Sequence, residues 1–177
     1  MLNPRLTLVI VMILMAVASR LIPHPPNLTS VTAVALFGGA MLDDRRLAFL
    51  VPLGAMFVGD LILGFHDQMP LVYGSFALIV CIGLWLQRHR SAATIAGAAL
   101  GSSVLFFVMT NFGVWALDHM YPRNLDGLIA CYTAALPFFG NTLAGDILYT
   151  ALLFGGFALL ERQFPELRVR EASVIAI

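Results

Sequence analysis

Long apolar runs separated by short polar segments make up most of the chain. A membrane-spanning helix needs about 20 apolar residues, and roughly 17 are tolerated. The pattern therefore predicts six spanning helices, over residues 5–22, 28–42, 46–64, 70–87, 92–117 and 141–161. The second run is the shortest, and its Gly38-Gly39 pair indicates an irregular or closely packed helix.

One apolar segment does not fit this series. Residues 125–138, "LDGLIACYTAALPF", are too few to cross a membrane and carry a proline near their end. They predict a short interfacial helix, surface-lying or partly re-entrant, that ends near Pro137 before the last span.

The arginines fall unevenly on the two sides that six spans define. One side holds Arg5, Arg45, Arg46, Arg88, Arg90, Arg162, Arg168 and Arg170. The other side holds Arg20 and Arg123. Loops rich in arginine and lysine stay in the cytoplasm, so both termini are expected there. The predicted location is the bacterial inner membrane, crossed several times.

Composition agrees with a membrane protein. The 177 residues are 60% hydrophobic and 11% charged, and the mean hydropathy is +0.90. A soluble domain would carry roughly twice that charge. We therefore expect an all-α integral membrane fold, a single domain over residues 1–177 in the lipid bilayer. Because no basic stripe with interleaved aromatic residues occurs, nucleic acid is not an expected partner.

The first 18 residues also fit a second interpretation. Arg5, the apolar residues 6–15 and the sequence Ala16-Val17-Ala18 match the three parts of a secretory signal peptide. The alternating arginines favour a first helix that is retained.

Two carboxylates lie within predicted spans, in similar local sequences. Asp60 occurs in "VGDLILG" and Asp146 in "AGDILYT". A charge in hydrocarbon costs roughly 2.5–3.5 kcal/mol or more, so an unpaired acid there marks a functional site. Both acids fall about one turn below the outer ends of their helices.

Other polar residues are expected at the same depth in the membrane. Arg20 ends the first helix, and Asn141 begins the sixth, where it can cap the helix N-terminus. Trp115 and Tyr132 are candidate stacking surfaces. These residues predict an outward-facing pocket between helices 1, 3, 5 and 6, covered by three outer loops. The predicted ligand-binding set is Arg20, His24, Asn27, Asp60, His66, Asn111, Trp115, Arg123, Tyr132, Asn141 and Asp146.

A purely structural interpretation stays open for each acid. Asp60 and Arg20 could form an internal salt bridge that joins two helices, and Asp146 and Asn111 could form a packing hydrogen bond. Packing does not require one common depth, so the shared depth favours a site.

One long segment resembles a known family. "RLIPHPPNLTSVTAVALFGGAMLDDRRLAFLVPLGAMFVGDLILGFH" resembles the first three helices of the substrate-binding S components of energy-coupling-factor (ECF) vitamin transporters. "NTLAGDILYTALLFGGF" is similar to their last helix. The chain is most similar to a group of small bacterial membrane proteins with the same S-component-like pattern.

The resemblance implies a six-helix protein that captures a vitamin-like micronutrient from outside. It implies ligand contacts for Arg20, His24, Asn27 and Asp60. It also implies an ECF-type transmembrane subunit and ATPases as partners. S components commonly dock that subunit through small residues spaced four apart on the first helix, and here Arg20 follows Ala16. Similar spacing occurs instead at Ala35/Gly39 and at Ala93/Gly97/Gly101.

Other functional classes have weaker support in the sequence. The chain has no lysine and hence no Walker A motif, and it lacks G-x-S-x-G and H-E-x-x-H. We therefore expect neither an enzyme nor a cofactor or bound metal. A transition-metal site formed by His24, His66 and His119 with Asp67 and Asp118 remains an alternative. So does a structural or assembly subunit, in which Asp60 and Asp146 would pair with arginine and leave no cavity.

Overall fold

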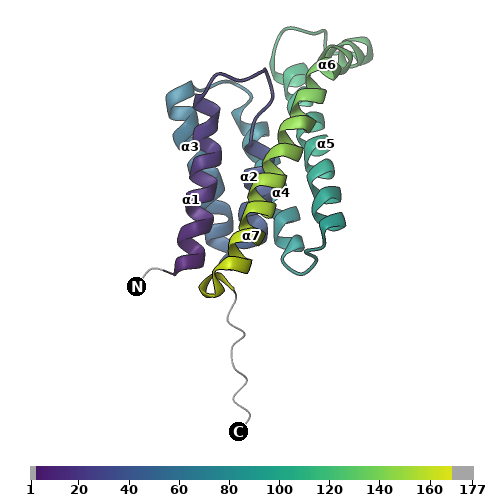
Figure 1. Cartoon of the computed structure of the whole chain (residues 1–177). Coiled ribbons are helices and arrows are strands. Elements are labelled where there is room, and N and C mark those ends of the chain that lie inside the picture. Colours follow the sequence, from purple (N-terminus) through teal and green to yellow (C-terminus); the bar gives the residue numbers. More distant parts are fainter. Residues whose placement is uncertain (1–2, 169–177) are drawn as a thin grey trace.

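The computed structural model describes residues 3–168, which fold into helices without a strand. Figure 1 shows these helices packed side by side as a bundle. Their bounds are α1 Pro4–Ala18, η1 Ser19–Leu21, α2 Val31–Met41, α3 Arg45–Leu63, α4 Met69–Leu86, α5 Ala92–Leu117, α6 Leu125–Thr150, η2 Ala151–Gly155, α7 Gly156–Gln163 and η3 Pro165–Leu167.

Five helical stretches of the described chain are long and apolar enough to cross a membrane. They are Pro4–Leu21, Arg45–Leu63, Met69–Leu86, Ala92–Leu117 and Leu125–Gln163. The chain is therefore an all-helical, multi-pass membrane protein, as its hydropathy predicts. The predicted second span, 28–42, is shorter than expected, because α2 has 11 residues. An 11-residue helix is only about 16 Å long, about half the hydrocarbon thickness.

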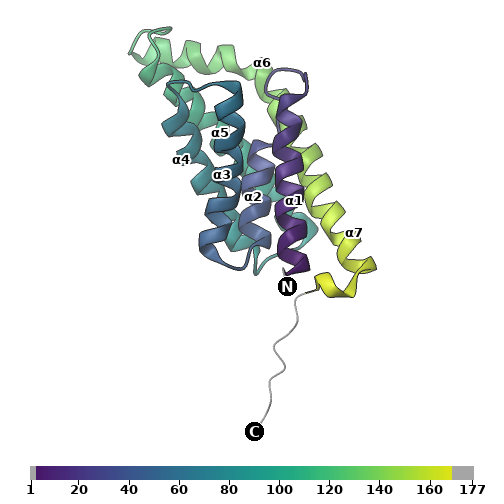
Figure 2. The ribbon, with the colours of Figure 1, turned by 90° about the vertical axis from the view of Figure 1, so that its left-hand side faces the viewer.

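The segment before the last predicted span also differs from the prediction. Residues 125–138 and 141–161 belong to one uninterrupted helical stretch, Leu125–Gln163, and Pro137 lies inside it. Figure 2 shows the first part of α6 crossing the end of the bundle before the helix bends and continues along it into α7. A proline inside a helix removes one hydrogen bond and bends the axis, so here it turns the helix without ending it.

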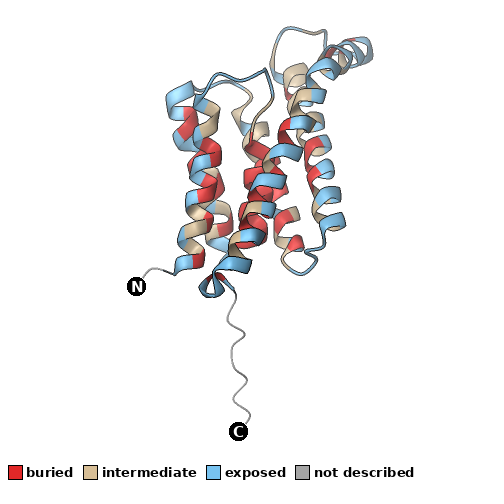
Figure 3. Cartoon of the chain, in the orientation of Figure 1, coloured by how far each residue is buried: buried red, intermediate tan, exposed pale blue. Residues whose placement is uncertain are grey.

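The short helix α2 occupies the centre of the bundle. All 11 of its residues are buried, and α4 is its most extensive neighbour. A Cβ atom added at Gly39 would lie 2.4 Å from the carbonyl oxygen of Val80 and 2.9 Å from Cα of Gly83. Only glycine allows the two backbones to approach this closely. Figure 3 shows the buried residues gathered on α2 and on the faces turned toward it.

The other small-residue repeat has a different environment. A Cβ atom added at Gly97 or Gly101 of α5 would meet nothing within 4 Å. Gly39 therefore serves packing within the chain, whereas Gly97 and Gly101 face open space.

Both ends of the described chain meet at one end of the bundle (Figure 1). The buried Arg5 donates through Nη1 to Glu161 at 2.6 Å and to the carbonyl oxygen of Leu167 at 2.8 Å. Its guanidinium also lies over the ring of Phe157, 4.8 Å from the centroid. Burial lowers the pKa of Arg90 in the α4–α5 loop, and the nearby positive charge of Arg5 lowers it further. Arg170, counted with this side above, lies outside the described residues.

The two glycine environments give a direct test of the α2–α4 contact. Gly39→Ala should lower the free energy of unfolding by about 1–3 kcal/mol, because the new methyl group meets backbone atoms that have no room to move. Thermal unfolding of the detergent-solubilised protein measures the difference. Gly97→Ala is the matched control and should keep or raise stability, by up to about 1 kcal/mol, since alanine favours helix. Equal melting temperatures for the two variants would contradict the assigned contact.

Candidate functional site

A cavity of about 490 Å³ lies at the end of the bundle away from the chain termini. The residues that line it come from η1, the α1–α2 loop (loop 1, residues 22–30), the start of α2, α3, the α3–α4 loop, α4, α5, the α5–α6 loop and α6. Small-molecule sites in proteins usually measure about 300–1,000 Å³. The cavity therefore has the size of a site for a small organic molecule.

One wall of the cavity is polar and carries a salt bridge. Nη1 of Arg20 lies 3.0 Å from one carboxylate oxygen of Asp60, and the hydroxyl of Tyr73 donates to the other oxygen at 2.7 Å. Asp60 is 4% exposed, so the ion pair neutralises a buried acid. The Arg20 side chain keeps 17% of its surface accessible and lines the cavity. Because a guanidinium has five N–H donors, Arg20 can hold Asp60 and still meet a ligand.

Loop 1 forms a second part of the wall and is held from two sides. The amide of Asn141 on α6 donates to the carbonyl oxygen of Pro26 at 3.0 Å. The hydroxyl of Ser30 donates to the carbonyl oxygen of Ala16 on α1 at 2.6 Å. Asn27 has φ +64°, in the left-handed region that asparagine tolerates better than most residues. These contacts fix the loop where Asn27 and Thr29 line the cavity.

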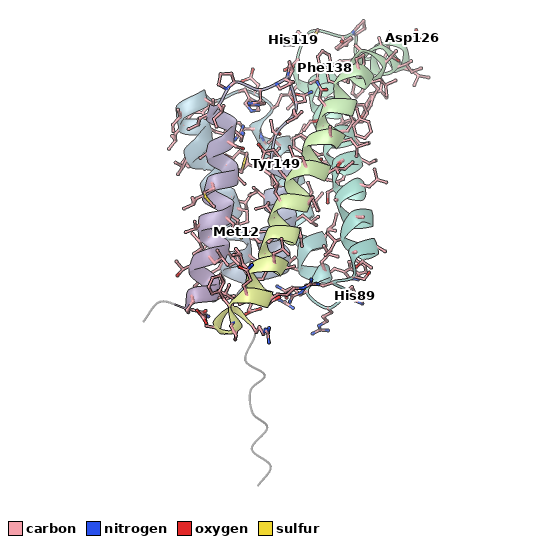
Figure 4. All side chains as sticks on the ribbon, viewed as in Figure 1. Met12, His89, His119, Asp126, Phe138 and Tyr149 are labelled. Atoms are coloured by element: carbon pink, nitrogen blue, oxygen red, sulfur yellow. The ribbon has the colours of Figure 1, made fainter. Side chains whose placement is uncertain are left out.

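Another part of the cavity wall is aromatic. Phe76 of α4 stacks on Phe106 of α5 with centroids 5.6 Å apart, and Phe107 lies 4.7 Å from Phe139 of α6. Phe138, labelled in Figure 4, lies on α6 near the same end of the molecule and also lines the cavity. The sequence analysis did not select these phenylalanines, because aromatic residues in spanning helices are common and only the fold shows which of them meet.

The predicted site residues divide into two groups. Five of the eleven line the cavity, namely Arg20, Asn27, Asp60, His66 and Asn111. The other six lie outside its lining, namely His24, Trp115, Arg123, Tyr132, Asn141 and Asp146.

Loop and interface residues of the second group have partners of their own. Nδ1 of His24 lies 2.7 Å from the carbonyl oxygen of Ile22 in its own loop, and Arg123 is exposed. The indole N–H of Trp115 donates to Pro122 at 3.0 Å, and the hydroxyl of Tyr132 donates to Val108 at 2.7 Å. The two predicted stacking surfaces therefore bind backbone carbonyls next to the cavity.

The structure contradicts the expected cap at Asn141 and the alternative left open for Asp146. Asn141 lies inside α6 and does not cap its start, since Asn124 is the N-cap residue. Asp146 does not bond Asn111, whose amide donates to the carbonyl oxygen of Phe107 at 2.8 Å. Asp146 instead accepts hydrogen bonds from Thr32 and Ser103. Of the two buried acids, only Asp60 lines the cavity.

Metal-binding side chains do not gather in the described part of the chain. Within residues 3–168, no three side chains of the His, Cys, Asp and Glu types come close enough to hold an ion. Cys81 is exposed and Cys131 is buried in the cavity wall, and both are free thiols.

The Arg20–Asp60 bridge should be essential for the stability of the polar wall. Asp60→Asn leaves the guanidinium of Arg20 without its counter-charge, and breaking a buried ion pair in this way costs about 3–5 kcal/mol. Thermal unfolding in detergent measures the loss. The double variant Arg20→Met with Asp60→Leu is the control and should recover much of the stability, because it removes both charges. If the double variant lost as much stability as Arg20→Met and Asp60→Leu lose when made singly and added together, the pairing would be contradicted.

The comparisons with known proteins place the chain in one family. Residues 1–167 match the model of a family of unknown function, DUF6580, so the chain belongs to that family. No curated protein and no solved structure matches the chain significantly. None of these comparisons links the chain to S components of ECF transporters.

Proposed function

We propose that this member of DUF6580 is a membrane uptake protein that binds a small, vitamin-like organic molecule from the extracytoplasmic side. The observation that carries the proposal is the cavity of about 490 Å³ between the Arg20–Asp60 bridge and the phenylalanine wall. A simple packing role for the polar residues would not leave such a space at one end of the bundle.

The chemistry of the two walls defines the class of ligand. The phenylalanines favour a flat, apolar ring system, because stacked and edge-on aromatic contacts add to the burial of apolar area. Arg20, Asn111 and Thr110 also line the cavity and offer polar groups to the ligand. Since Asp60 already neutralises Arg20, a neutral or zwitterionic molecule fits better than a strongly charged one.

The arginine distribution supports the proposed orientation. The Arg5–Glu161 bridge and Arg90 lie with the chain ends, on the arginine-rich side. By the positive-inside rule that side faces the cytoplasm, so the cavity faces outward in the bacterial inner membrane.

The resemblance to S components extends the proposal to its partners. The chain contains no lysine and therefore no Walker A motif for ATP hydrolysis. An ECF-type transmembrane subunit with ATPases would supply the energy for uptake. A structural or assembly subunit is the alternative. It predicts arginine partners for both acids and no cavity, whereas Asp146 bonds two hydroxyl groups and a cavity is present.

Native mass spectrometry of the protein purified from its own host membranes tests the binding role. We expect a stoichiometric small organic mass that is lost when the protein is denatured. Protein without a bound molecule that brings down other membrane subunits would favour the assembly role.

Replacing each of two alanines on α6 by phenylalanine tests the location of the site. Ala135 lines the cavity, whereas the exposed Ala130 of the same helix does not. Ala135→Phe should fill the cavity and reduce the retained ligand at least tenfold. Ala130→Phe adds the same side chain outside the cavity and should retain the ligand as the wild type does. Equal retention by both variants, measured as bound fraction in the native spectrum, would place the site elsewhere.

A further inference from the structure

Asp146 is a buried acid that the proposed ligand site does not use. It lies in α6 and is 2% exposed. Its two hydrogen-bond partners are hydroxyl groups, of Thr32 on α2 and of Ser103 on α5, the latter at 2.6 Å. Hydroxyl groups stabilise a carboxylate, yet they do not cancel its charge.

The elements packed around Asp146 provide no positive charge in the described chain. Neither α2 nor α5 contains a titratable residue. On α6 the nearest one is Tyr149, whose hydroxyl pairs with Ser19 at the end of α1 at 2.7 Å. In η1 and loop 1, Arg20 is bound to Asp60, and His24 is exposed and bound to Ile22.

An ionised carboxylate in such a place is strongly unfavourable. Moving an isolated charge into a medium of low dielectric constant is so unfavourable that the group takes up a proton instead. We therefore propose that Asp146 is a proton-binding site, which holds its proton at neutral pH and whose occupancy controls how loop 1 is seated.

The hydrogen-bond geometry has a place for this proton. Oγ of Ser103 lies 3.0 Å from the carbonyl oxygen of Ala99 and 2.6 Å from Oδ2 of Asp146. Ser103 has one hydrogen for these two acceptors, and when Asp146 is protonated that hydrogen goes to the carbonyl oxygen of Ala99. The protonated Asp146 then donates to Ser103, while Thr32 donates to Oδ1. In this arrangement each hydroxyl and the carboxylic acid have a partner.

The acid is connected to the cavity wall on both sides. Thr142, one helical turn before Asp146, lines the cavity. Thr32 is the second residue of α2, two positions after the end of loop 1. Next to Asp146, a Cβ atom added at Gly145 would lie 2.9 Å from backbone atoms of Thr29. Loss of the proton would place a bare charge between α2, α5 and α6, draw water in, and loosen the start of α2 together with loop 1.

Infrared difference spectroscopy of the detergent-solubilised full chain tests the protonation. The wild type should show the carbonyl-stretch band of a protonated carboxylic acid at pH 7. Asp146→Asn, which has nearly the same shape and no charge to lose, should lack this band. Asp126→Asn, at an exposed acid in the first turn of the same helix, is the matched control and should retain the band. A wild-type spectrum without a band that depends on Asp146 would overturn the proposal.

Sodium is the competing occupant. The hydroxyls of Ser102 and Thr150, on α5 and α6, are buried without a hydrogen-bond partner in the described chain and could supply oxygen ligands. Addition of sodium chloride at constant pH, with choline chloride as the control, should leave the band unchanged. A band that sodium alone removes would assign the site to that cation and overturn the proposal.

Hydrogen exchange tests the link to loop 1 and needs no ligand, so its result does not depend on the proposed uptake function. In the wild type, peptides covering residues 27–34 should lose protection at least tenfold at alkaline pH, after correction for intrinsic exchange rates. In Asp146→Asn the same peptides should stay protected. An identical pH response in the two proteins would show that Asp146 does not control the loop.

Discussion

The close contact between α2 and α4 at Gly39 and Gly83 is the constraint on which the rest of the structure depends. A side chain at either glycine would meet backbone atoms of the other helix. Because the backbones touch, an 11-residue helix can be enclosed on all sides by longer ones. A helix this short begins well below the end of the bundle. Loop 1 therefore has to descend into the bundle, and this descent makes Asn27 and Thr29 part of a cavity wall.

The bend in α6 closes the same space from above. Pro137 turns the helix, so its first part crosses the end of the bundle (Figure 2). That part contributes Cys131, Ala134 and Ala135 to the cavity lining. Had the helix ended at the proline, as the sequence analysis expected, a flexible connection would stand where a continuous helix now holds the aromatic wall. The cavity is thus produced jointly by a short helix and a bent one.

The two buried acids show how one local pattern acquires two roles. Asp60 and Asp146 have similar neighbours in the sequence, each following a glycine. In the fold, Asp60 meets Arg20 and Tyr73 and remains at the cavity. Among residues 3–168, the hydrogen-bond partners of Asp146 are two hydroxyl groups, and Asp146 does not line the cavity. Whether a buried acid is neutralised by a counter-charge or by a proton depends on the side chains that other helices place next to it.

The sequence by itself determined the class of the protein and most helix positions. The expected ranges 46–64, 70–87 and 92–117 lie within one residue of α3, α4 and α5. Hydropathy is a local property, so length and composition identify a spanning helix without its neighbours. Only the tertiary structure decided which polar residues share the cavity and that Pro137 bends the helix that it was expected to end. The reason is that these outcomes depend on partners distant in sequence, such as Thr32 and Asp146, which are 114 residues apart.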